Sequence, residues 1–79
     1  MSKEITPEMF RILRAVDFGR FSVNESGRYV IEGEPRPDRR SRELLAKRDM
    51  IDWRWTKESG TQWYVTEKGK KALGFSVQP

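Results

Sequence analysis

The spacing of hydrophobic residues along this chain changes between the period of a helix and the period of a strand. Met9, Ile12 and Val16 recur at helical spacing, whereas residues 21–31 and 51–65 contain segments that alternate between apolar and polar side chains. A chain of 79 residues has room for one small hydrophobic core. The sequence therefore predicts a single α+β domain over residues 1–79. We expect a core of about residues 5–74, and a tail at 75–79.

Three segments carry the start and stop signals of helices. Thr6 is a typical N-cap before a proline, and Gly19 is a typical stop for the helix that follows. Asp38 is a candidate N-cap for a second helix that ends at about residue 48, and Thr66 is one for a short last helix. On the first helix, Arg11 is expected to face solvent, opposite the apolar residues.

Two hairpins are expected, each closed by a turn that contains Glu-Ser-Gly. Asn24 and Gly27 have the chemistry of a tight turn in the first hairpin. In the second, aromatic residues alternate with polar ones, which predicts strands with one buried face. Because so small a domain needs the buried area, at least two of three tryptophans are expected in the core: Trp53, Trp55 and Trp63.

Two stretches of the sequence correspond to a known arrangement of a helix and a hairpin. They are RRSRELLAKRDMIDWRW, as a recognition helix and first wing strand, and QWYVTEKGKKAL, as a second wing strand and closing helix. Over residues 36–74, the chain resembles the winged-helix DNA-binding domains of small bacterial and phage regulators. The resemblance implies that the recognition helix enters the major groove of DNA and that the second hairpin, as the wing, lies over an adjacent phosphate backbone. The expected fold is a winged-helix-like α+β domain of about three helices and two β-hairpins. The family normally has a second helix before the recognition helix, where this chain has room for a single turn at most.

Basic residues are concentrated around the start of the second predicted helix. Residues 36–48 contain six basic and two acidic residues, and this excess equals the net charge of the chain, +4. A helix N-terminus favours acids, so arginines there are expected to meet an external polyanion such as double-stranded DNA. The candidates for groove or phosphate contacts are Arg39, Arg40 and Arg42, and those for phosphate positioning are Arg36, Lys47, Arg54 and Lys57.

Other interpretations of the same residues stay open. The basic helix can be a solvated face on which Glu43 pairs with Arg39 or Lys47. The domain can also be a protein-interaction adaptor or inhibitor that docks on an acidic partner surface, with Trp55 and Tyr64 as further contacts. A third option is the stacking of single-stranded RNA bases on the hairpin aromatics.

The composition argues against several classes of protein. Without histidine or cysteine, the chain lacks the commonest general base and the thiolate ligands of metal sites, so we expect no catalytic residue, metal or cofactor. The apolar runs are too short for a membrane span, and the start MSKEITPE is typical of a cytoplasmic protein. A bacterial or phage transcription regulator, or a phage accessory factor, is the expected role. The sequence does not define the oligomeric state, and a homodimer on DNA is one option.

Overall fold

The computed structural model describes residues 5–74, which form three helices and two antiparallel hairpins, as the sequence predicts. The helices are α1 (Pro7–Asp17), α2 (Arg39–Lys47) and α3 (Glu67–Ala72). The first hairpin pairs β1 (Phe21–Val23) with β2 (Tyr29–Ile31), and the second pairs β3 (Ile51–Thr56) with β4 (Gly60–Val65). The fold is therefore α+β. The predicted tail at 75–79 lies outside the described residues.

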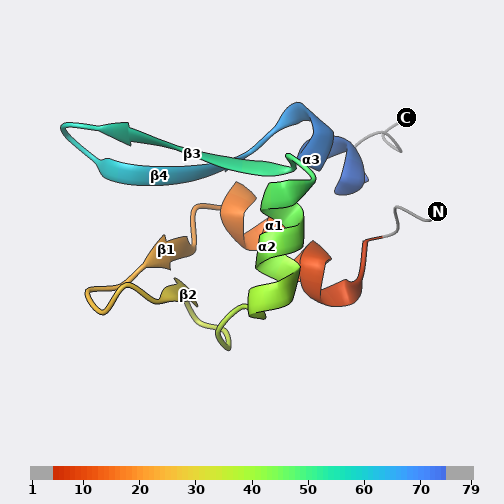
Figure 1. The fold of residues 1–79 in the computed structure, drawn as a ribbon, viewed down its shortest axis with the longest axis horizontal. Coiled ribbons are helices and arrows are strands. Elements are labelled where there is room, and N and C mark those ends of the chain that lie inside the picture. Colours follow the sequence, from red (N-terminus) through yellow and green to blue (C-terminus); the bar gives the residue numbers. More distant parts are fainter. Residues whose placement is uncertain (1–4, 75–79) are drawn as a thin grey trace.

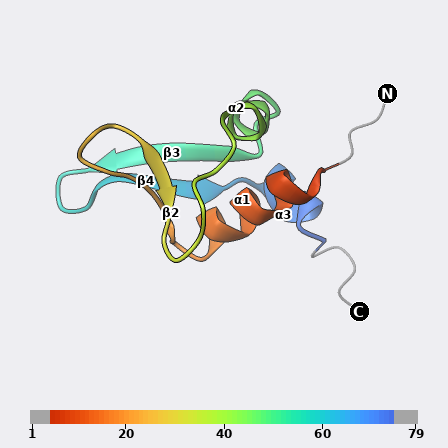
Figure 2. The same cartoon turned by 90° about the horizontal axis from the view of Figure 1, so that it is seen from below.

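Both hairpins extend in the same direction away from the helices (Figure 1). At their base, α1 contacts β1 and β4, while α2 contacts β3 (Figure 2). The first turn of α2 follows the loop that leaves β2, and its last turn leads into β3 (Figure 1). Helix α2 thus runs from the first hairpin to the second. Its basic N-terminal end lies on the side of the first hairpin.

Helix α1 provides much of the hydrophobic core. The Thr6 hydroxyl oxygen accepts a hydrogen bond from the Met9 backbone N–H at 3.1 Å, which caps the helix as predicted. Its inner face packs against residues of both hairpins, of α2 and of the turn after α2. The buried core residues are Met9, Ile12, Leu13, Ala15, Val16, Phe21, Ile31, Leu45, Met50, Ile51 and Val65.

The first hairpin has the predicted tight turn. The Asn24 side-chain oxygen accepts hydrogen bonds from the backbone N–H groups of Ser26 and Arg28, at 2.9 and 3.0 Å. Gly27 has a φ of 81°, in the left-handed region that favours glycine. This geometry places Arg28 immediately after the turn, and Tyr29 at the start of β2.

Helix α2 begins with the predicted cap. An Asp38 carboxylate oxygen accepts a hydrogen bond from the Ser41 backbone N–H at 2.9 Å. Leu45 is fully buried, and Ser41, Leu44 and Arg48 are half-buried, which confirms the short inward face expected for this helix. With one fully buried side chain, α2 keeps most of its surface exposed.

The second hairpin contradicts the expectation that two tryptophans are core residues. Trp63 is half-buried and packs against the core, but Trp53 and Trp55 are 53% and 63% exposed. Ile51 and Val65 at the base of the hairpin are buried. The hairpin reaches beyond the helices, so the helices do not cover its outer part (Figure 1).

Helix α3 closes the core behind β4. Thr66 caps it by accepting a hydrogen bond from the Gly69 backbone N–H at 3.1 Å. Gly69 is buried, and a Cβ atom there would overlap the Met50 carbonyl oxygen and crowd the Val65 side chain. Glycine lowers the stability of a helix, but close packing requires it at this position. Half-buried Ala72 and Leu73 pack on the core, as expected.

Candidate nucleic-acid interface

The loop before α2 is held in place by Arg11 of α1. Its guanidinium donates hydrogen bonds to both carboxylate oxygens of Glu8, at 2.9 and 2.8 Å, and to Glu34 at 3.1 Å. It also donates to the backbone carbonyls of Pro35 and Arg36, at 3.0 and 3.2 Å. The expectation that Arg11 faces solvent is therefore wrong, because three of its acceptors belong to a loop that folds back over α1.

Glu8 extends this anchor to the start of α2. One of its carboxylate oxygens accepts a hydrogen bond from the Asp38 backbone N–H at 2.8 Å. The hydrogen bond from Arg11 lowers the pKa of Glu8 below its ordinary value; burial opposes this shift and the Asp38 N–H adds to it. Glu34 is also within 3.7 Å of Arg20. The carboxylates of Glu8 and Glu34 are thus engaged by arginines outside α2.

The same loop borders a surface hollow that four arginines line. Arg36 comes from the loop, Arg39 and Arg42 from α2, and Arg28 from the first hairpin. Among the described residues that line the hollow, Glu43 is the only acid. We call this surface the arginine hollow. One guanidinium group can donate two parallel hydrogen bonds to a phosphate or a carboxylate. The hollow therefore has the chemistry of an anion site.

Two of these arginines have defined side-chain contacts. Arg39 pairs with Glu43 at 3.0 Å, as in the interpretation of α2 as a solvated face, but the two side chains are 83% and 56% exposed. Such an exposed pair contributes little and opens easily. Arg42 lies over the Tyr29 ring, 3.9 Å from its centre, and is half-buried. This contact fixes the position of Arg42 against the first hairpin.

The other predicted site residues are more dispersed. Arg40 is exposed beside the cap residue Asp38, whose pKa is lowered mainly by hydrogen bonds from the Ser41 backbone and side chain. Lys47 is exposed in the last turn of α2, and Lys57 in the turn between β3 and β4. The structure thus brings Arg36, Arg39 and Arg42 together, with Arg40 next to them in sequence.

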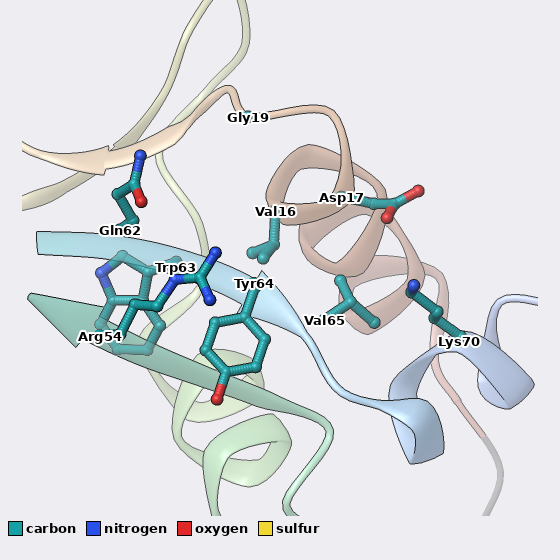
Figure 3. A pocket seen from close by; sticks show the side chains of 9 residues that line it. All are labelled: Val16, Asp17, Gly19, Arg54, Gln62, Trp63, Tyr64, Val65 and Lys70. Atoms are coloured by element: carbon teal, nitrogen blue, oxygen red, sulfur yellow. The ribbon is translucent and has the colours of Figure 1, made fainter. Parts of the chain in front are cut away.

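Arg54 belongs to a different surface. It lies over Tyr64, 5.4 Å from the centre of the ring, and lines a hollow with residues of α1 and α3 (Figure 3). Along β3 it alternates with the exposed tryptophans, so its side chain leaves the opposite face of the hairpin. Arg54 therefore does not share a surface with the arginine hollow.

Arg28 was not among the residues predicted from the sequence. Its position after Gly27 marks it as part of a turn, but the turn signal does not say what the hairpin packs against. The link is Tyr29, which contacts Arg42 on one side and the rings of Phe21 and Trp63 on the other, with centre-to-centre distances of 5.6 and 5.8 Å for the two rings. Aromatic contacts thus join the arginine hollow to the second hairpin.

Within residues 5–74, no three His, Cys, Asp or Glu side chains come together as metal ligands would. None of the described helices combines the length and hydrophobicity needed to cross a lipid bilayer. No protein-family model, curated protein or solved structure matches this chain. The interpretation of the arginine hollow therefore depends on its own geometry.

Proposed function

We propose that the protein binds double-stranded DNA as a winged-helix-like domain, with α2 as the recognition helix and β3–β4 as the wing. The observation that carries this proposal is the arginine hollow, where two elements and a loop bring four guanidinium groups together around one exposed acid. A regulator of transcription, or a phage accessory factor, is the role that the proposal implies.

Electrostatics at the start of α2 supports a polyanionic partner. Arg39 and Arg40 occupy the first turn, which contains no acid after the cap residue Asp38. Cations at this end of a helix lower its stability by a few tenths of a kcal/mol each. A duplex carries about one negative charge per 1.7 Å, so each phosphate contact can offset that loss.

The first hairpin takes the place where a winged-helix domain has its second helix. We infer that this hairpin supplies the missing backbone contact through Arg28, which lines the hollow opposite α2. The proposal therefore uses five arginines, namely Arg28, Arg36, Arg39, Arg40 and Arg42. Contacts from Lys47, Arg54 and Lys57 stay predictions, and Arg54 would make its contact outside the arginine hollow.

Salt dependence of duplex binding tests the proposal. With five phosphate contacts, the logarithm of the binding constant for a duplex of about 20 base pairs should fall against the logarithm of the salt concentration with a slope of about −4.5. The Arg39→Gln/Arg40→Gln variant should give a slope of about −2.7. Lys68→Gln/Lys71→Gln on α3 removes the same charge and should keep the parent slope. Equal changes in both variants would mean that net charge alone drives binding.

A second candidate function is docking on an acidic protein surface as an adaptor or inhibitor. The exposed aromatic residues Trp55 and Tyr64 favour it, because aromatic side chains are enriched where proteins meet. Failure of the parent protein to bind any duplex, even at low salt, would select this function over the first.

A further inference from the structure

We propose that the protein also binds unpaired bases, on the face of the second hairpin that carries Trp53 and Trp55. This inference depends on the proposed nucleic-acid function and specifies its substrate: a duplex that continues into a single-stranded segment. It starts from the two tryptophans, which the fold leaves 53% and 63% exposed.

The pairing of the strands identifies the face on which these tryptophans lie. Trp53 is directly opposite Trp63 in the antiparallel register, and directly opposite residues share a face. Trp63 contacts Phe21 and Tyr29 of the first hairpin, with ring centres 5.5 and 5.8 Å apart. Trp55 follows Trp53 by two residues, so it leaves the same face. Both exposed rings therefore leave the face of the second hairpin that is turned toward the first hairpin.

The same face is continuous with the arginine hollow. Tyr29 lines the hollow beneath Arg42 and also contacts Trp63, the cross-strand neighbour of Trp53. A nucleic acid whose phosphates occupy the hollow can therefore continue along the second hairpin. The adjacent positive charge favours a nucleic acid over an uncharged apolar partner on these rings.

The chemistry of the rings selects unpaired nucleotides. Indole rings bind bases by stacking, which requires a free base face, and an intact duplex buries those faces in its own stack. Side chains two residues apart on a strand are about 6.8 Å apart, close to twice the 3.4 Å rise per nucleotide of a stacked strand. The spacing of Trp53 and Trp55 therefore suits a base between the two rings or one base on each.

The test compares three DNA ligands at one salt concentration: a blunt duplex, the same duplex with a single-stranded overhang of about eight nucleotides, and the overhang strand alone. The parent protein should bind the overhang duplex at least about fivefold more tightly than the blunt one, with quenching of tryptophan fluorescence. Trp53→Ala/Trp55→Ala should bring the overhang duplex to the affinity of the blunt duplex. Trp55→Phe, which keeps an aromatic ring, should retain part of the preference for the overhang duplex over the blunt duplex.

Tyr64→Ala is the matched control, because Tyr64 is an exposed aromatic residue on the opposite face of the same hairpin. It should leave the preference unchanged. Trp55→Ala alone leaves the Trp53–Trp63 pair in place. It therefore tests the loss of the preference even if the double variant folds poorly. Equal affinity of the parent for blunt and overhang duplexes would overturn the inference and leave the proposed function intact. An equal loss for both ligands in the tryptophan variant would also overturn it. Binding of the single strand without binding of any blunt duplex would overturn the proposed function instead.

Discussion

Arg11 on α1 and the arginines at the start of α2 carry the same charged group in opposite surroundings. Arg11 is bonded to two carboxylates and two backbone carbonyls, and it holds the loop between the first hairpin and α2. The hollow that borders the same loop is lined by four arginines and one acid. The fold therefore uses nearby acids to neutralise its structural arginine. It leaves the arginines of the hollow with a single exposed carboxylate, which is the condition for binding an external anion.

Replacing the structural arginine should have the largest effect on stability. Arg11→Met would leave the part-buried carboxylates of Glu8 and Glu34 without their main donor, and should lower the free energy of unfolding by about 2–3 kcal/mol. Chemical denaturation at neutral pH measures this loss. Arg14→Met is the matched control on the same helix, since exposed Arg14 lies against the Phe10 and Phe18 rings and should matter by less than about 1 kcal/mol. Equal losses of stability in the two variants would contradict the structural role of Arg11.

Acid should weaken the same anchor. Because the pKa of Glu8 is lowered in the folded protein, its ionised form stabilises the fold at neutral pH, and this contribution is lost as the pH falls through the folded-state pKa. Glu8→Gln should reduce stability at pH 7 by about 1–2 kcal/mol and flatten the acid limb of the pH profile. Thermal unfolding from neutral to acidic pH measures both effects. Glu25→Gln, in the exposed turn of the first hairpin, should leave the profile close to that of the parent.

Replacing Glu43, the single acid of the hollow, should have the smallest effect, and this effect is on duplex binding. Glu43→Gln should strengthen duplex binding by about two- to fivefold at moderate salt, because it removes the only negative charge among the arginines that line the hollow. Loss of its pair with Arg39 should lower stability by no more than about 0.5 kcal/mol. The same affinity gain in Glu67→Gln, which changes the charge of α3, would show that the position of Glu43 is irrelevant.

The local features of this fold could be predicted from the sequence because their signals span only a few residues. The three helix caps, Thr6, Asp38 and Thr66, each bond to a backbone N–H three residues ahead. The turn from Asn24 to Gly27 closes over a similar distance. In these cases, the identity of the residue and its immediate neighbours determine the conformation.

Features that depend on distant parts of the chain could not be predicted. The acceptors that hold Arg11 to the loop lie 23 to 25 residues away, and helical spacing alone places its side chain in solvent. Trp53 and Trp63 show the same alternation along their strands, but Trp63 packs against rings of the first hairpin whereas Trp53 stays 53% exposed. Arg28 joins the hollow because its hairpin folds toward α2, a tertiary contact that no short pattern encodes.

Thermal unfolding of Arg39→Gln/Arg40→Gln, with and without duplex, tests most directly whether these arginines serve an external polyanion. Without DNA, the variant should be within about 0.5 kcal/mol of the parent, because removing cations from the first turn of α2 offsets the loss of the Arg39–Glu43 pair. With duplex at about a hundred times the parent dissociation constant, the parent should gain about 2.7 kcal/mol, and the variant less than about 1 kcal/mol. A variant that loses more than about 1 kcal/mol without DNA, and is stabilised by duplex as much as the parent, would contradict the account.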